Sequence, residues 1–233
     1  KDELAGVIIE PFQRLIPPQP GFLQALRRVT QEHGIPLIFD EVVTGFRFAY
    51  GGAQEYYGVT PDLCSLGKII GGGYALAAIA GRADIMAHFD RQAVGDEDYL
   101  TQIGTLSGNP VAAVAGLATL NVLKQPGAYD RVFATGRTLM QALAGLLKDA
   151  GLKAQVIGEP PLFDILFTDA PIRDYRDTLK ADKNLATRFN QLLRAKGIMK
   201  GETKYYVSLA HDQADIDRTI GIWREAVAEL AKG

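Results

Sequence analysis

The sequence predicts an α/β fold, in which a mostly parallel sheet is followed by a smaller α+β domain. First, short apolar runs alternate with helical patterns over the first half of the 233 residues. Their connections are short, about two to six residues, which is typical of strand–helix–strand units in a parallel sheet. Second, strand patterns mix with long helical ones after Asn109. Third, polar residues follow the apolar runs, as they do at the carboxyl ends of strands in such sheets.

Residues 1–124 are predicted to be the later part of a large domain. Residues 5–11 form an apolar run that is typical of a buried strand. A buried parallel strand needs neighbours on both sides, and no strand or helix precedes this one. We therefore expect the chain to be the later part of a longer polypeptide, with an N-terminal portion of the fold missing here. Next we expect a helix over 22–29 that ends at Gly34, strands over 36–39, 63–65 and 75–80, and a helix over 83–89.

Residues 125–233 are predicted to form the smaller C-terminal domain. The helix before it, over 110–123, is rich in alanine and apolar residues and is expected to be long and buried. The charged stretch 169–182 contains a proline and is expected to be a surface loop. The remaining elements are predicted as helices over 129–150, 184–196 and 213–231, strands over 154–157 and 162–167 around a turn at 158–161, and a strand over 205–209.

The composition excludes several classes of function. The apolar fraction of 47% and the charged fraction of 22% are ordinary, and the net charge of −2 gives no attraction to nucleic acid or to an anionic membrane surface. No apolar run approaches the roughly 18–20 residues that a membrane span needs. The single cysteine, Cys64, excludes an internal disulfide and fits a reducing compartment, so we expect a cytoplasmic protein. The three histidines form no pattern for acid–base or metal chemistry.

Lys68 is the main candidate for catalysis. It ends a short apolar run, has glycines on both sides, and has no polar neighbours in the sequence to solvate its amine. Burial lowers the pKa of an amine and gives a neutral nitrogen that can form a Schiff base. A phosphate-binding P-loop is excluded, because that motif needs serine or threonine after the lysine and Ile69 stands there. We expect Gly71–Gly73 to form a close-approach turn beside the reactive lysine.

Asp40 and Glu41 supply carboxylates at the end of another apolar run. Adjacent residues of a strand point to opposite faces, so at most one can face a given site, and the other is expected to make a structural hydrogen bond or salt bridge. A strand-end aspartate alone is more often a helix cap than a catalyst, by roughly two to one. With a lysine, however, it meets the needs of an electron-sink cofactor such as pyridoxal phosphate, whose aldehyde takes the lysine and whose ring nitrogen takes the acid.

A third candidate, Gly104–Pro110, lies directly before the helix over 110–123. It combines hydroxyls and backbone amides with a proline in the first helical turn, which is typical of an anion site fit for a phosphate. The alternative is an ordinary N-cap supplied by Ser107 or Asn109, and taken alone the stretch favours that alternative.

Together these residues resemble the class III aminotransferases, which are fold-type I enzymes that depend on pyridoxal phosphate. The resemblance covers nearly the whole chain, and it implies that the sheet is part of the large domain of that fold. Within the family, residues 49–60 are most similar to the glutamate-1-semialdehyde aminomutase branch. The resemblance rests on Glu10–Pro11, 39–42, 44–47, 61–73, 104–110, 205–210 and 215–217.

The resemblance implies roles for four residues and a cofactor, pyridoxal 5'-phosphate. Lys68 would bind the cofactor aldehyde and then move the substrate proton as general acid and base. Asp40 would keep the ring nitrogen protonated, and Val42 would pack against the face of the ring. Thr105 would reach the cofactor phosphate of the neighbouring subunit, which implies an obligate homodimer.

The resemblance also implies an activity, with alternatives. We expect transfer of an amino group from an amino acid or amine to a keto acid or aldehyde, through two ping-pong half-reactions, with small molecules as the only substrates. One alternative is an aminomutase of the glutamate-1-semialdehyde type, and another is a non-catalytic fragment or pseudoenzyme that only dimerises. Many family members carry an arginine for the substrate carboxylate near the edge of the C-terminal domain, whereas Lys200–Val207 contains lysines and no arginine.

Overall fold

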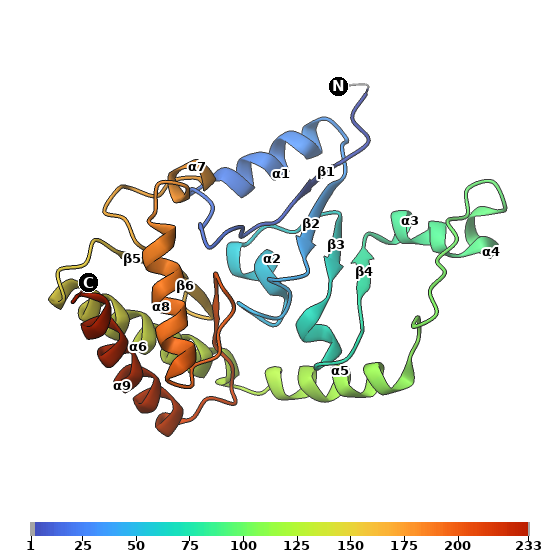
Figure 1. Cartoon of the computed structure of the whole chain (residues 1–233). Coiled ribbons are helices and arrows are strands. Elements are labelled where there is room, and N and C mark those ends of the chain that lie inside the picture. The colour runs from blue at the N-terminus through green and yellow to red at the C-terminus, as the bar shows by residue number, and fades with distance from the viewer. Residues whose placement is uncertain (1–2, 233) are drawn as a thin grey trace. The chain divides into compact units, whose positions relative to one another are not determined.

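The computed structural model describes residues 3–232 and divides into two compact units (Figure 1). The first unit holds the chain up to Phe12 together with Pro18–Pro126, and the second holds Gln13–Pro17 and the chain from Gly127 on. The predicted domains, 1–124 and 125–233, extend to residues 1, 2 and 233, which lie outside the described residues. Their assignment as a partial large domain and a small C-terminal domain stays a prediction.

The first unit is built on a four-stranded sheet in the order β1-β2-β3-β4, and the predicted α/β class is confirmed. Strands β1 (Val7–Ile9), β2 (Leu37–Glu41) and β3 (Leu63–Leu66) are parallel, whereas β4 (Ala78–Gly81) is antiparallel to β3. The alternation of strands and helices in the sequence predicts parallel strands, and the antiparallel β4 corrects that prediction for this strand. Only residues 67–77 join β3 to β4, and a parallel crossover needs a dozen or more residues.

The expectation that the first strand is buried is wrong for the described chain. β1 stands at one edge of the sheet, and the side chain of Ile8 is 66% exposed. Helix α1 (Phe22–Glu32) follows and packs Leu23 into a core with Leu37, Phe39, Val59 and Cys64. The short helices of this unit are α2 (Gly52–Tyr57), α3 (Ala83–Met86) and α4 (Arg91–Val94), and the predicted helix over 83–89 is divided into α3 and the 3-10 helix η2 (Ala87–Phe89).

Helix α5 (Pro110–Leu123) has the predicted bounds but is not buried. Figure 1 shows it running past the end of β3 and the start of β4, where it packs against the 3-10 helix η1 (Lys68–Gly71). The contact is close at Gly116, where an added Cβ would lie 2.2 Å from the carbonyl oxygen of Ile70. Within the described residues only this face of α5 is covered, and Val114 is 67% exposed, while Val111, Leu117 and Val122 on its other faces are exposed as well.

The second unit combines an antiparallel sheet with three long helices. Strands β5 (Gln155–Glu159), β6 (Leu162–Leu166) and β7 (Tyr205–Tyr206) form the sheet in that order. The helices are α6 (Ala128–Asp149), α8 (Lys183–Ala195) and α9 (Gln213–Leu230), and α9 packs against both others. The core surrounds Trp223, whose side chain is fully buried. This arrangement has the helices and strands that the sequence predicts for an α+β unit.

Three predictions for the second unit need correction. β5 continues to Glu159, because Glu159 pairs with Leu162, so the turn is the two-residue Pro160–Pro161 and not 158–161. The strand expected over 205–209 ends at Tyr206. The stretch 169–182 is not simply a surface loop, because it contains helix α7 (Tyr175–Thr178) and the buried side chain of Asp177. Asp177 is held by hydrogen bonds from Arg173 and Lys180, which lower the pKa of its carboxyl.

Candidate active site

Asp40 lies near the carboxyl end of β2, next to Ser65 of β3 in the parallel register. Its Oδ1 accepts a hydrogen bond from the backbone N–H of Val42 at 3.0 Å and one from the Ser65 hydroxyl at 3.2 Å. Within the described residues its Oδ2 accepts no hydrogen bond. The carboxylate is therefore oriented by two donors while one oxygen stays available to a further donor.

Lys68 follows β3 at the same edge of the sheet and starts η1. Its φ of 52° is in the left-handed region, which is uncommon for a residue with a side chain and occurs preferentially at functional sites. The preceding Gly67 packs on Val42, since a Cβ at Gly67 would lie 3.3 Å from Val42 Cγ1. The turn after β2 and the turn after β3 are thus in contact, and this contact brings the segments of Asp40, Val42 and Lys68 together.

The expectation that Lys68 is shielded is wrong for the described chain, in which its side chain is exposed. The reason is its position, because η1 begins where the sheet ends and only Gly71 of that turn is buried. The predicted close-approach turn is confirmed at Gly72, although the neighbour it approaches is α5. With φ 57°, Gly72 lies so near that helix that a Cβ would be 2.5 Å from the carbonyl oxygen of Ala115.

Glu41 takes the structural role that the alternation of a strand predicts for one of the two carboxylates. Its side chain is 0% exposed, and its Oε2 accepts hydrogen bonds from the Ala53 N–H at 2.6 Å and from the Thr44 hydroxyl at 3.0 Å. Its Oε1 accepts from the Gln54 N–H and side-chain amide. Glu41 therefore fixes the start of α2 to the end of β2, and this bond network holds the backbone next to Asp40.

Asp62 holds the amino ends of β2 and β3 together. It accepts hydrogen bonds from the Leu37 N–H at 2.8 Å, from Arg27 at 2.6 Å and from Arg82 at 3.1 Å. Burial alone would raise the pKa of this carboxyl, but the donors Arg27, Leu37 and Arg82 together lower it below its ordinary value. The network stabilises the strands on which the predicted site residues depend.

Thr105 lies apart from this group. It occupies an exposed turn over residues 105–108, and no hydrogen bond joins it to Asp40, Val42 or Lys68 in the described chain. The N-cap alternative for this stretch is what the structure contains, because Asn109 Oδ1 accepts from the Val111 and Ala112 N–H groups. Those two donors are therefore occupied, and a phosphate contact by Thr105 stays a prediction.

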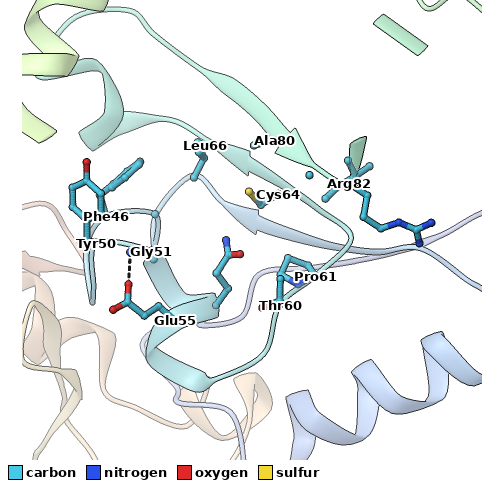
Figure 2. Close-up of a pocket in the computed structure, with 15 residues that line it drawn as sticks. Phe46, Tyr50, Gly51, Glu55, Thr60, Pro61, Cys64, Leu66, Ala80 and Arg82 are labelled. Carbon is cyan, nitrogen blue, oxygen red and sulfur yellow. Dashed lines mark hydrogen bonds between the residues drawn. The ribbon is translucent and has the colours of Figure 1, made fainter. Parts of the chain in front are cut away.

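A cavity of about 630 Å³ in the first unit lies on the other face of the sheet (Figure 2). Cys64 and Leu66 line it, and they alternate with Ser65, the partner of Asp40, so they point away from the Asp40 face. Figure 2 shows Phe46, Tyr50 and Glu55 on one side of it and Arg82 on the other. Burial raises the pKa of the Cys64 thiol, which disfavours the thiolate and makes this cysteine a poor nucleophile. None of the four predicted site residues lines the cavity.

Ser65 is the site residue that the sequence interpretation missed. Its signal was a hydroxyl in the middle of an otherwise apolar strand, Leu63–Leu66. Only the register of β2 against β3 shows that this hydroxyl meets Asp40.

The chain as a whole is similar to known proteins. A family profile described as aminotransferase class-III matches residues 1–222, and the chain belongs to this family of pyridoxal-phosphate-dependent enzymes.

In the described residues no helix has the length and apolar character to cross a bilayer.

Two relatives carry the name glutamate-1-semialdehyde 2,1-aminomutase. The one from Thermomicrobium roseum is 40% identical over 238 residues, covering 100% of this chain and 54% of the relative. The second one from Brevibacillus brevis is 41% identical over 237 residues, covering 99% of this chain and 54% of the relative. The chain therefore spans about half the length of the curated relatives it matches.

Among solved structures, an omega-transaminase from Sphaerobacter thermophilus matches with a TM-score of 0.92 and 36% identity, over 100% of this chain and 53% of that one. A β-phenylalanine aminotransferase from Variovorax paradoxus matches with a TM-score of 0.87 and 35% identity, over 96% of this chain and 52% of that one. The similarity to transaminase structures is thus as extensive as the similarity to aminomutase sequences.

Proposed function

We propose that the full-length protein containing this chain is a pyridoxal-phosphate-dependent aminotransferase that moves an amino group from an amino acid or amine to a keto acid or aldehyde. The observation that carries the proposal is the pair of turns at the end of the sheet. Lys68 follows β3 in a left-handed conformation, and Asp40 is held on the neighbouring β2 with one carboxylate oxygen uncommitted. An amine and a carboxylate on adjacent strand ends match the two groups that the cofactor needs.

The residues present fit the cofactor by the chemistry of their donors and acceptors. When bound, pyridoxal 5'-phosphate supplies an aldehyde and an electron-withdrawing ring that stabilises negative charge at the substrate carbon. The uncommitted Oδ2 of Asp40 is an acceptor suited to a ring N–H, and the hydrogen bonds from Ser65 and Val42 fix the direction of that carboxylate. Val42, half-buried against Gly67, supplies an apolar surface for the ring.

Lys68 has two proposed roles, attachment of the cofactor and transfer of the substrate proton. Its Nζ would attach the cofactor through the aldehyde, and it would also take the proton from the substrate carbon and return it. The Asp40 carboxylate would accept a hydrogen bond from the ring N–H and so hold that proton on the ring nitrogen. Each role is assigned to a single side chain, so each can be tested by one substitution.

The proposal includes a homodimer in the cytoplasm. Thr105 lies in an exposed turn and not beside Asp40, Val42 or Lys68, which is the placement expected of a residue that reaches the cofactor phosphate of a neighbouring subunit. The exposed apolar side chains of α5, such as Val114 and Leu117, lie on the helix that follows this turn. Chemical cross-linking of wild type and a Thr105→Ala variant, with cofactor affinity measured on both, tests the interface and the contact separately.

An aminomutase is the second candidate, because two relatives at 40% and 41% identity bear that name. A mutase moves the amino group within one substrate and needs no added keto acid, whereas a transaminase does not turn over without one. Turnover of glutamate-1-semialdehyde with and without a keto acid separates the two.

The test of the enzyme proposal uses the full-length protein. Added pyridoxal 5'-phosphate should give visible absorbance in the wild type and in the control Lys148→Ala, whose lysine is exposed near the end of α6. Lys68→Ala should lose that absorbance and the amino transfer. A wild-type protein that stays colourless with excess cofactor contradicts the proposal and favours the non-catalytic, dimerising alternative.

A further inference from the structure

A second cavity, of about 580 Å³, lies entirely within the second unit. Its walls come from the segment 13–17, β6, α7, α8 and residues 202–204. This volume is within the range of small-molecule sites, about 300–1,000 Å³. It contains none of the residues assigned to the proposed reaction, so its chemistry needs its own explanation.

One wall of this cavity is a polar stripe along α8. Lys183, Thr187, Asn190 and Arg194 recur at helical spacing and line the cavity. Another face of the helix places Phe189 and Leu193 in the core. The cavity also has an apolar side, formed by Phe167, Tyr175 and Leu179. The lining therefore combines an apolar wall with a polar one, as sites for amphipathic small molecules do.

Most of the anionic side chains that line the cavity have polar partners, whereas most of the cationic ones in the described chain do not. Its lining has four cationic side chains and three anionic ones, and two of the anions are committed elsewhere. Asp164 is paired with Lys200 at 3.0 Å, and Asp182 accepts the N–H groups of Asn184 and Leu185 as the N-cap of α8. Within the described residues, no ion pair and no side-chain hydrogen bond is formed by the cations Arg14, Lys183 and Arg194.

Arg14 is the best placed of these cations. Arg14 and Leu15 both adopt left-handed backbone conformations, with φ 56° and 63°, and the buried side chain of Leu15 anchors this turn. Two consecutive strained residues persist only where the surrounding structure requires them. The Arg14 guanidinium lies over the ring of Tyr175, with its central carbon 5.3 Å from the ring centroid, and within the described residues its N–H groups donate no hydrogen bond.

We propose that this cavity binds a small organic carboxylate, with the Arg14 guanidinium as its receptor and the wall of Phe167, Tyr175 and Leu179 against its apolar body. The planar fork of an arginine matches a carboxylate with two parallel hydrogen bonds. Lys200 cannot serve as a freely available receptor, because its ammonium is buried, paired with Asp164 and packed over the ring of Tyr205.

Two kinds of ligand carry such a carboxylate, and the experiment distinguishes them. It is either the carboxylate of the amino-acid substrate, in which case the inference rests on the proposed aminotransferase function, or that of a separate effector. Binding of the carboxylate itself needs no cofactor and is measured without any turnover. Failure of carboxylate binding and failure of the proposed enzyme activity are therefore distinguishable.

The direct test is calorimetric titration of the cofactor-free full-length protein with 4-phenylbutyrate and its uncharged amide. The acid should bind saturably and the amide at least ten-fold more weakly. Arg14→Gln should weaken binding of the acid by about ten-fold or more, because hydrogen bonds to a charged group contribute about 1.5–3 kcal/mol, or ten-fold per 1.4 kcal/mol. Arg14→Lys, which keeps the charge without the fork, should fall between the two.

The control is Arg28→Gln, which removes an exposed arginine of α1 whose nearest carboxylate, Glu32, lies 3.9 Å away. It should bind the acid as the wild type does. Equal binding of acid and amide, or equal binding by wild type and by Arg14→Gln, overturns the proposal. If Arg14→Gln does not fold, as judged by circular dichroism, the Arg14→Lys variant decides, and wild-type affinity in it overturns the proposal.

The source of the carboxylate is read from kinetics of the cofactor-loaded protein. If the substrate supplies it, Arg14→Gln raises KM for an amino-acid donor by about ten-fold or more and leaves KM for a carboxylate-free amine unchanged. If an effector supplies it, neither KM changes and 4-phenylbutyrate alters the rate of the wild type only. Both results support the binding site and assign it a different occupant.

Discussion

Replacing Glu41 by alanine tests whether its buried carboxylate holds the carboxyl end of β2. The substitution removes the acceptor of the Ala53 N–H and of the Thr44 hydroxyl, and both residues are buried. A buried donor without an acceptor costs about 1–3 kcal/mol, so two such donors give about 2–6 kcal/mol. We expect a loss of about 4 kcal/mol, a large part of the roughly 5–15 kcal/mol that stabilises a typical protein.

Hydrogen–deuterium exchange read by mass spectrometry localises this effect. A loss of about 4 kcal/mol corresponds to nearly a thousand-fold faster exchange wherever opening limits exchange. Peptides covering β2 and α2 should show this change, and peptides of the second unit should not. Glu41→Gln keeps one acceptor oxygen but turns an amide toward the remaining donors, so its effect should be smaller, about 1–3 kcal/mol.

The matched control is Glu32→Ala, which removes an exposed glutamate at the end of α1. Its effect on exchange in β2 and α2 should be within a few fold of none, because exposed ion pairs contribute little. If Glu41→Ala exchanges within ten-fold of Glu32→Ala in those peptides, the reasoning from buried hydrogen bonds is refuted.

Three further predictions concern other elements. The ionised Asp62 carboxylate stabilises the fold above its unfolded pKa of about 3.9, and this contribution is lost as the pH falls through its lower folded pKa. In thermal scans Asp62→Ala should therefore lower Tm at pH 7, and the decrease of Tm below about pH 4 should be smaller in this variant than in the wild type. Gly116→Ala should cost about 1–3 kcal/mol in urea unfolding, because its Cβ would meet the Ile70 carbonyl oxygen. Lys200→Met should cost about 3–5 kcal/mol, followed by Trp223 fluorescence, because it leaves buried Asp164 unpaired.

Each of these predictions has a control with the same chemistry. Asp149→Ala removes an exposed carboxylate and should keep the wild-type Tm at pH 7. Gly145→Ala adds a methyl group in open space on α6 and should be neutral or stabilising. Lys153→Met breaks an exposed pair with Asp169 and should change stability by less than about 1 kcal/mol. A variant that behaves like its control contradicts the corresponding prediction.

The order of the elements was predictable from the sequence, while their directions and exposure were not. Apolar runs and helical spacing locate β2, β3 and the long helices because both patterns are local. The direction of β4 depends on the length of the connection after β3, which an apolar run does not report. The exposure of α5 depends on how much of the helix contacts η1, which is a tertiary property. The sequence alone predicted Val114 and Leu117 as core residues because they are apolar, but both are exposed.

The candidate site divides in the same way. Asp40 and Lys68 were predictable as candidates, because each directly follows or ends an apolar run that becomes a strand. The Ser65 hydrogen bond was not, because it depends on the register between two strands. The contact of Arg14 with Tyr175 was not either, because it joins segments from distant parts of the sequence and depends on tertiary structure.

The identity of the lysine that binds the cofactor is the most direct test of the account. The full-length protein is incubated with pyridoxal 5'-phosphate, reduced with borohydride and digested, and the modified lysine is located by mass spectrometry. The account predicts a reduced cofactor adduct on Lys68 at one per chain, and loss of that adduct in Lys68→Ala but not in Lys148→Ala. An adduct on another lysine, with full labelling retained in Lys68→Ala, would contradict it.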